Sequence, residues 1–301
     1  MVKGPKKRLG ISRKLPQARI GVFGGSGLYD MELLQEVKEV SVPTPFGRPS
    51  GKFIVGSLKG VPVAFLPRHG LGHTLLPSEI NYRANIFAMK KLGVERILSV
   101  SAVGSMKEEI APGDVVIPDQ FYDLTKGRRS TFFGGGIVAH VSFADPVCPE
   151  LTEVVSMAGQ DVGGTIHRGG TYLCMEGPQF SSRAESDIHR GWGVSVIGMT
   201  NVTESKLARE AEICYVTMAM ATDYDCWHIG AGPVTAEMVL KTLRENVALS
   251  KNMIQAAVGR IDLKRNCLCA EALNNAIVTD PSSIPRKLKS SLKPIMGKYL
   301  S

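Results

Sequence analysis

The sequence predicts an α/β fold in which one central β-sheet is covered by helices on both faces. Several apolar runs rich in β-branched residues are continuous rather than alternating, which is typical of strands buried on both faces. Segments with helical periodicity lie between these runs, and strands that alternate with helices indicate an α/β fold. No internal repeat, linker or composition break divides the 301 residues, so we expect a single domain over residues 18–280.

The individual elements follow from the same patterns. The first strand is expected from Ala18, where the apolar run ARIGVF ends in glycines. Further strands are expected at residues 52–57, 61–67, 96–102, 114–118, 170–175, 194–199 and 213–222. Helices are expected at residues 78–92, 182–191, 204–212 and 235–257. Ser78, which follows Pro77, is the expected N-cap of the first helix.

Basic residues concentrate at the two ends of the chain. The net charge is +8, and residues 1–19 carry seven basic side chains and residues 281–301 carry five, with no acidic residue in either segment. The remaining 24 basic and 28 acidic side chains leave the body mildly acidic, at −4. We therefore expect a basic N-terminal extension over residues 1–17. A basic C-terminal tail is expected over residues 281–301, wrapped on the surface or on a neighbouring subunit.

Composition argues against several functional classes. No run approaches the about 20 consecutive apolar residues of a membrane-spanning helix, so no membrane contact is expected. The basic ends lack interleaved aromatic residues and zinc-finger spacing, which argues against specific nucleic-acid binding. Six cysteines are too few for a disulfide scaffold, and the N-terminus lacks the apolar core of a secretion signal. The expected location is the cytoplasm.

A glycine-rich turn over residues 24–27 (GGSG) follows the first strand. A dinucleotide site is excluded because the third glycine position of GxGxxG is Asp30, and a Walker loop is excluded because no GK[ST] follows. What remains is a turn whose backbone N–H groups and one hydroxyl can hold an anion the size of phosphate. A tight turn without a ligand is the alternative.

Arg68 and His69 stand at the end of another apolar strand. A guanidinium there offers a planar pair of donors to a phosphate, and the imidazole can add another donor. A purely structural pair is the alternative. His73 is interpreted as structural, because no third metal ligand lies within sequence reach. The small residues of the segment 99–105 (SVSAVGS) let backbone amides approach a ligand closely.

Two further strand ends carry candidate residues. Phe180, beside Gly177 and Pro178, is either a plate for stacking a flat base or an ordinary core residue. Asp223 and Asp225 follow a strongly apolar strand with one residue between them, so continued extension places both carboxylates on one side of the chain. Two acids at a strand mouth are costly unless they are solvated, paired or used in function.

The order and spacing of these motifs resemble those of the methylthioadenosine phosphorylases in the purine nucleoside phosphorylase superfamily. The resemblance spans residues 18–260 and rests on GGSGLYD, TPFGRPS, PRHG, INYRANI, SAVGS, PGDVVIPDQFYD, AHVSFADP, EGPQFSSRAES, GMT and ATDYDCW. It implies a mixed, partly barrel-like sheet and phosphorolysis, in which phosphate attacks the anomeric carbon of 5′-methylthioadenosine and releases adenine and 5-methylthioribose 1-phosphate. It also implies no metal or organic cofactor, with phosphate as co-substrate, and a homotrimer or homohexamer with sites at subunit interfaces.

The resemblance also implies roles for individual residues. Phosphate is expected to be bound by Ser26, Arg68, His69, Ser101, Ala102 and Thr200. The nucleoside is expected to contact Met199 at the ribose, Phe180 at the purine, His140 of an adjacent subunit at the 5′ position, and Val234, Val239 and Leu240 around the methylthio group. The expected catalytic residues are Asp223, which serves the imidazole-ring nitrogen of the base, and Asp225, which serves its exocyclic amino group.

The chemistry explains why these residue types are needed. Cleavage builds positive charge on the ribosyl ring and negative charge on the departing base, so a phosphate dianion and a protonated acid both lower the barrier. An aspartic acid donates that proton near pH 7 only if its pKa rises by about 3, which burial and a neighbouring carboxylate can supply. Phosphorylases of the superfamily that are specific for 6-oxopurines carry Asn where Asp223 stands, so two acids favour a 6-aminopurine.

Three other functions stay open at this point. One is a broader purine nucleoside phosphorylase that acts on adenosine, inosine or methylthioinosine, another is a nucleoside-binding protein without catalysis, and the third is a polyanion-binding protein that acts through the basic tails. Family members often have Arg or Gln at the position of Leu71 and Asn at the position of Gly198, which leaves the fine substrate preference open.

The cysteines are expected to be reduced thiols. Cys148 and Cys214 match a pair that is bridged in some archaeal relatives, so a disulfide is the alternative that the resemblance implies. The Cys267-x-Cys269 spacing alone does not predict a metal site.

Overall fold

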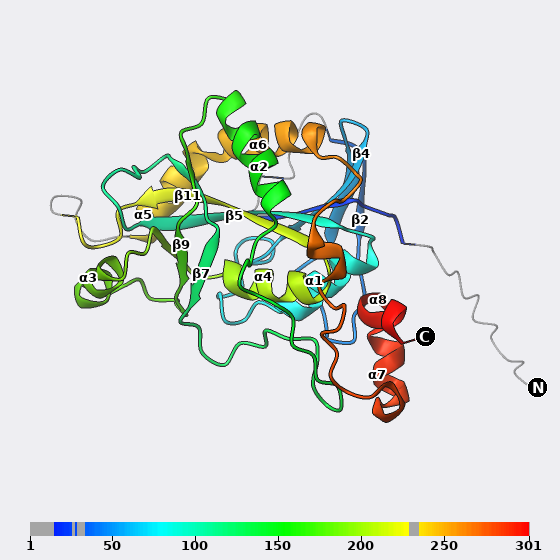
Figure 1. Cartoon of the computed structure of the whole chain (residues 1–301). Coiled ribbons are helices and arrows are strands. Elements are labelled where there is room, and N and C mark those ends of the chain that lie inside the picture. The colour runs from blue at the N-terminus through cyan, green and yellow to red at the C-terminus, as the bar shows by residue number, and fades with distance from the viewer. Residues whose placement is uncertain (1–14, 26–27, 29–33, 229–234, 301) are drawn as a thin grey trace, which may run out of the picture.

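The computed structural model describes residues 15–25, 28, 34–228 and 235–300 (Figure 1). Its described strands form one mixed sheet flanked by helices, which confirms the expected fold class. The strands are β1 (Ile20–Gly24), β2 (Leu34–Val40), β3 (Phe53–Leu58), β4 (Val61–Pro67), β5 (Arg96–Ser105), β6 (Val115–Ile117), β7 (Gln120–Asp123), β8 (Ile166–Arg168), β9 (Thr171–Cys174), β10 (Val196–Gly198) and β11 (Cys214–Asp223). None of the described helices meets the length and apolarity that crossing a membrane requires.

Strand β5 is the branch point of the sheet. It pairs in parallel with β1 and β11 and, near its end, antiparallel with β10. One branch continues through β10, β9 and β7, and the other continues through β11, β6 and β8. Because β1, β4, β5 and β11 are parallel, their carboxyl ends meet at one edge. A register shift between Ala221 and Asp223 of β11 brings Asp223 opposite Gly104 of β5.

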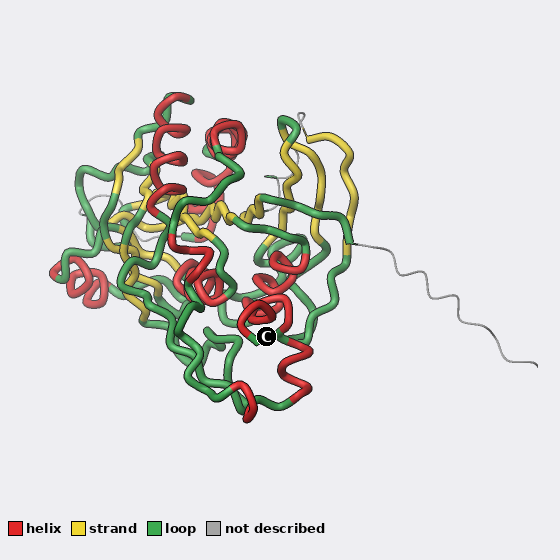
Figure 2. Tube along the Cα trace, turned by 45° about the vertical axis from the view of Figure 1, so that its right-hand side comes forward, coloured by secondary structure: helices red, strands yellow, loops and turns green. Residues whose placement is uncertain are grey.

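Helices cover the sheet on both faces. They are α1 (Tyr82–Lys91), α2 (Pro149–Asp161), α3 (Arg183–Gly191), α4 (Asn201–Glu210), α5 (Ala236–Glu245), α6 (Val247–Arg260), α7 (Arg286–Ser291) and α8 (Lys293–Met296), with short 3₁₀ turns η1 (Leu268–Glu271), η2 (Pro281–Ser283) and η3 (Gly297–Tyr299). Helices α1 and α4 pack together below the sheet in the view of Figure 1, and α2 and α6 pack together above it. Figure 2 shows the strands between these two groups of helices.

The expected helices are present, but three of them differ in extent. The helix expected over residues 204–212 is α4, which begins three residues earlier, at Asn201, and ends at Glu210. The first helix begins at Tyr82 because Asn81, not Ser78, caps it by accepting a hydrogen bond from the backbone N–H of Ala84. The expected long helix over residues 235–257 is two helices, since Asn246 ends α5 and begins α6. Helix α3 begins as expected, with a capping box between Ser182 and Glu185.

Several elements were not expected from the sequence, among them β2, β7, β8, α2 and the two tail helices α7 and α8. Strand β2 lies at the edge of the sheet and is largely exposed, so its sequence LQEVKEV lacks the continuous apolar run of the inner strands. Strands β7 and β8 are only four and three residues long. Helix α2 begins with a proline in its first turn, and its buried face is a narrow stripe that includes Leu151 and Val155.

The C-terminal tail over residues 281–300 packs against the domain. Helix α8 contacts α1, and Figure 1 shows α7 and α8 beside it. Leu292, Ile295 and Met296 are buried in the same hydrophobic core as Ile86 and Met89 of α1. These three apolar side chains therefore anchor the tail to the body of its own chain.

Candidate active site

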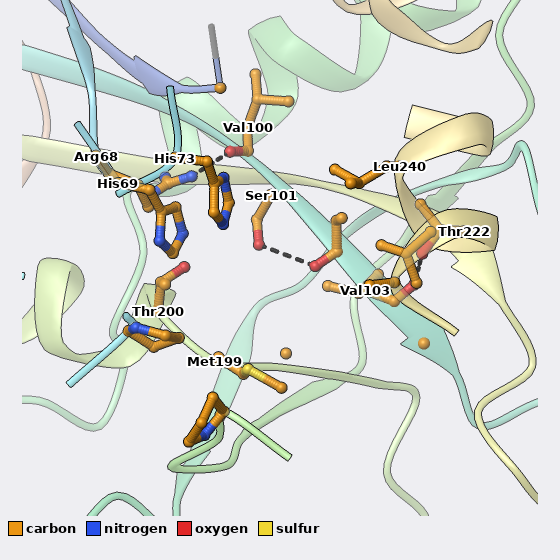
Figure 3. Close-up of a pocket in the computed structure, with 18 of the residues that line it drawn as sticks. Arg68, His69, His73, Val100, Ser101, Val103, Met199, Thr200, Thr222 and Leu240 are labelled. Atoms are coloured by element: carbon orange, nitrogen blue, oxygen red, sulfur yellow. Dashed lines mark hydrogen bonds between the residues drawn. The ribbon is translucent and has the colours of Figure 1, made fainter. Parts of the chain in front are cut away.

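A cavity of about 590 Å³ opens at the edge of the sheet where the parallel strands end (Figure 3). The carboxyl ends of parallel strands are where α/β proteins bind ligands, and this volume is typical of small-molecule sites. The expected site residues that line it are Arg68, His69, Ser101, Ala102, Phe180, Met199, Thr200, Asp223, Asp225, Val239 and Leu240. Ser26 and Val234 lie outside the described residues.

The cavity has two chemically different ends. In Figure 3, Arg68, His69, His73 and Thr200 gather at one end, and Thr222 and Leu240 lie at the other. Strand β5 crosses between them and contributes Ser101. A ligand that fills the cavity therefore meets cationic and hydroxyl groups on one side and acidic and apolar groups on the other.

Arg68 is buried and held in a fixed position by other side chains. Its Nε donates to Glu204 Oε1 at 2.7 Å, and its Nη2 donates to Glu204 Oε2 and to the Ser99 hydroxyl. Its Nη1 donates to the Val100 carbonyl. Burial lowers the pKa of Arg68, but the Glu204 carboxylate outweighs this effect and leaves the pKa above its ordinary value. The sequence did not predict a role for Glu204, because it lies 136 residues from Arg68 along the chain.

His69 is neutral in this environment. Its Nδ1 donates a proton to the Leu75 carbonyl at 2.9 Å, because a carbonyl oxygen only accepts. Burial, helped by the charge of Arg68, lowers the pKa of His69 to about 4. Its Nε2 is therefore an acceptor, able to receive the hydrogen of a phosphate O–H group. The ring stacks on that of His73, with centroids 4.2 Å apart.

The N-terminus of α4 opens on the same end of the cavity. Thr200 is the N-cap of this helix and lines the cavity, and its side chain makes no capping hydrogen bond. The unpaired N–H groups of a first helical turn and the helix dipole both attract anions. This contribution matters because Glu204 neutralises Arg68 and His69 is uncharged.

Asp223 and Asp225 lie together at the other end. Asp223 accepts a hydrogen bond from the Thr222 hydroxyl at 2.7 Å and one from the backbone N–H of Asp225 at 2.8 Å. The chain does not stay extended here, since Asp225 has φ of 50° in a turn, and this turn brings both acids into the cavity. Burial raises the pKa of Asp223 despite the two hydrogen bonds that lower it.

Gly104 makes room for this pair of acids. A Cβ at this position would lie 3.1 Å from Asp223 Oδ1 and 3.3 Å from the Cβ of Asp225. The absence of a side chain on β5 thus allows the carboxylate to sit directly against the strand.

The residues between the two ends are held by a second arginine that the sequence analysis missed. Arg128 donates to the carbonyl of Met199 at 2.5 Å and to that of Glu176 at 2.8 Å. These bonds hold the segments that follow β10 and β9, which carry Met199 and Phe180. Phe180 is 40% exposed and lines the cavity, so it is free to face a ligand and is not a core residue.

The two departures from the family pattern have different structural consequences. At Gly198 a Cβ would overlap the hydroxyl of Tyr172, so the Asn common in the family cannot be accommodated beside this tyrosine. The Tyr172 hydroxyl itself lies 3.5 Å from Ser101 Oγ. Leu71 is 74% exposed and does not line the cavity.

His140 does not line the cavity of its own chain. It is exposed, and its backbone N–H donates to the Ala276 carbonyl at 2.9 Å. The adjacent Ala139 forms an isolated bridge with Ile277. The expected role of His140 in an adjacent subunit stays a prediction.

Comparison with known proteins adds independent information. Residues 19–259 match the Phosphorylase superfamily. An S-methyl-5′-thioadenosine phosphorylase from Geobacter sulfurreducens is 60% identical over 282 residues, which cover 93% of this chain and 99% of the relative. Another from Koribacter versatilis is 56% identical over 94% of this chain and 97% of its own length.

Solved structures agree with this relationship. A methylthioadenosine phosphorylase from an antarctic soil metagenomic library superposes with a TM-score of 0.89 at 47% identity, covering 93% of this chain and 99% of the other. The enzyme from Schistosoma mansoni, in complex with adenine, gives a TM-score of 0.78 at 33% identity, covering 93% and 98%. The chain therefore belongs to the phosphorylase superfamily and, within it, to the S-methyl-5′-thioadenosine phosphorylases, which are pentosyltransferases.

Proposed function

We propose that this protein catalyses the phosphorolysis of 5′-methylthioadenosine to adenine and 5-methylthioribose 1-phosphate. One observation carries the proposal: a single cavity has Arg68, Thr200 and the N-terminus of α4 at one end and Asp223, whose pKa burial raises, at the other. The first end suits an anionic nucleophile, and the second suits a base that must leave with a proton.

In the proposed reaction a phosphate oxygen forms a bond to the anomeric carbon as the bond from that carbon to the purine nitrogen breaks. The electron pair of the broken bond passes to the purine. Asp223 donates its proton to the imidazole-ring nitrogen, so the base leaves as neutral adenine. Asp225 accepts a hydrogen bond from the exocyclic amino group, which favours 6-aminopurines. Met199 lies between the two ends, where the ribose would be held.

The proposed chemistry uses only the side chains of this chain and phosphate as co-substrate. Ser101, Ala102 and Thr200, with Arg68 and His69, form the proposed phosphate site. The Nε2 atom of His69 accepts a hydrogen bond from the O–H group of monohydrogen phosphate, and Arg68, which is paired with Glu204, contributes its guanidinium to this end of the cavity.

The 5′ end of the nucleoside meets apolar side chains in this proposal. Val239 and Leu240 of α5 line the cavity and suit a methylthio group better than a hydroxyl group. We propose that His140 closes this end from an adjacent subunit, in a homotrimer or a homohexamer. The proposal includes a cytoplasmic location, because six cysteines are too few for the disulfide scaffold of a small secreted protein.

The decisive assay measures adenine release from 5′-methylthioadenosine with and without phosphate. The proposal expects release only when phosphate is present, and a lower kcat/KM for adenosine and inosine. Equal turnover of all three nucleosides would favour a broad purine nucleoside phosphorylase. Tight binding of methylthioadenosine without phosphate-dependent cleavage would identify a binding protein instead.

A further inference from the structure

Four of the six cysteines form a cluster outside the active-site cavity. The Sγ atoms of Cys148, Cys214, Cys267 and Cys269 all lie within 4.8 Å of one another. Within the described part of the chain, no other set of three or more His, Cys, Asp or Glu side chains is close enough to share a metal ion. The fold therefore brings the two cysteines of the CxC segment close to two others that are remote in sequence.

Two of the four thiols are fixed by regular secondary structure. Cys148 is the N-cap of α2, and its backbone N–H donates to the Tyr215 carbonyl at 2.9 Å. Cys214 begins β11, and its backbone N–H donates to the Glu95 carbonyl at 3.0 Å. Both sulfurs are buried, so a rigid half of the site exists at the junction of the sheet and α2.

The other two thiols come from the segment that follows α6. Cys267 immediately precedes η1, and Cys269 lies within it. Between α6 and η2 the chain contains no regular element except this short 3₁₀ turn, and Figure 1 shows the stretch in orange. Cys269 is buried and Cys267 is half-buried, so the segment turns both sulfurs toward the sheet.

We propose that these four cysteines bind one zinc ion as a structural site. Four thiolates at about 2.3 Å from a tetrahedral zinc ion lie about 3.8 Å from one another. The cluster matches this arrangement, with Cys214 Sγ 3.3 Å from Cys267 Sγ and every other sulfur pair within 4.8 Å. Soft thiolate ligands in a tetrahedral S₄ set favour zinc. On binding, the thiols release their protons to solvent as the four sulfur–zinc bonds form.

Disulfide pairing explains the arrangement less well. A disulfide needs a sulfur–sulfur distance of about 2.05 Å, and neither Cys148 and Cys214, the pair that the resemblance implies, nor any other pair is bonded in the structure, since all six cysteines are free. Each sulfur is also close to the other three and not to a single partner. Mutual proximity of this kind is what a shared central ion requires.

The zinc site fastens the C-terminal part of the chain to the sheet. Apart from the cysteines, hydrogen bonds hold the segment after α6, such as those from Arg265 to the Glu212 carbonyl and from Arg96 to the Lys264 carbonyl. Cys214 and Asp223 are the two ends of β11, which places the cluster about 30 Å from the acids, at about 3.3 Å per residue. Loss of zinc should therefore lower stability and leave the chemical step unchanged.

The test measures metal content by plasma mass spectrometry on the full chain, purified without chelators or a metal-affinity tag. Wild type and the control Cys226→Ser, which removes a thiol outside the cluster, are expected to hold one zinc ion per chain. The double variant Cys267→Ser/Cys269→Ser is expected to hold none. Its Tm should fall by at least about 5 °C, while its kcat for methylthioadenosine stays near that of wild type.

Two further measurements on the wild type keep the proposal falsifiable if the double variant does not fold. Refolding with Co²⁺ should give the intense absorption of tetrahedral cobalt thiolate. Intact mass under non-reducing conditions should match six reduced cysteines. Two disulfides, reduced thiols that take up no zinc, or iron in place of zinc would each overturn the proposal.

Discussion

Burial shifts the pKa values of two groups that face the cavity. It raises the pKa of Asp223, which is the direction that proton donation to the base requires, and it lowers the pKa of His69 to about 4, which keeps the imidazole neutral. Arg68 stays charged because Glu204 offsets the cost of its burial. An anion at this end is therefore bound by hydroxyl groups and the α4 terminus as much as by net charge.

Glu210, which does not line the cavity, allows the effect of burial on a carboxyl pKa to be tested through the pH dependence of stability. Burial raises the pKa of Glu210 from 4.5 to about 7, although Thr131 and the backbone N–H of Phe132 donate to its two oxygens. The folded state therefore binds more protons than the unfolded state between these two values. The contribution of this carboxyl to stability is complete below pH 4.5 and is lost as the pH rises through 7.

We predict that Glu210→Gln removes this loss. The free energy of unfolding of wild type should decline relative to the variant between pH 5 and pH 8, by about 3 kcal/mol at most. Urea unfolding at several pH values measures it, with Glu109→Gln as the control because that side chain is exposed. Parallel pH profiles for wild type and Glu210→Gln would contradict the prediction.

The junction of β5 and β11 determines where the two acids lie. Continuous apolar runs identified both strands from the sequence, because inner parallel strands are buried on both faces. The bulge at Ala221 and the turn at Asp225 were not predictable, because they depend on pairing with Gly104 and not on local residue preference. Edge strand β2 was not expected because its side chains are largely exposed, so its sequence lacks the continuous apolar run that identified β5 and β11.

A substitution at Gly104 tests whether the junction of β5 and β11 positions the two acids. We predict that Gly104→Ala lowers kcat for methylthioadenosine roughly tenfold, because the new Cβ displaces the Asp223 carboxylate by a few tenths of an ångström. The control is Gly191→Ala, at a position where an added Cβ meets open space. Steady-state kinetics with both variants measures the effect, and equal kcat values for the two variants would refute this role of Gly104.

Across the molecule, sequence motifs located most of the site but not the residues that support it. Arg68, Thr200 and Asp223 lie at strand ends, where polar residues stand out against apolar runs. Glu204 and Arg128 reach their partners only after the chain has folded, across 136 and 71 residues, so no local signal marks them. The supporting roles of these two buried charged side chains become visible only in the folded structure.

The proposed assembly is tested at the exposed His140. We predict that His140→Ala keeps the fold, because its structural hydrogen bond uses the backbone N–H, and lowers the preference for methylthioadenosine over adenosine about tenfold. The ratio of the two kcat/KM values measures this preference, and light scattering after gel filtration should give the mass of a trimer or a hexamer. An unchanged ratio would count against the placement of His140 in a neighbouring site.

The variant Asp223→Asn tests whether Asp223 is the proton donor. The amide still accepts the backbone N–H of Asp225, and the Thr222 hydroxyl can turn to accept from its Nδ2, so the fold is preserved while the transferable proton is lost. We predict that kcat for phosphorolysis of methylthioadenosine falls at least about 100-fold, with the KM for phosphate near that of wild type. A kcat close to that of wild type would contradict it.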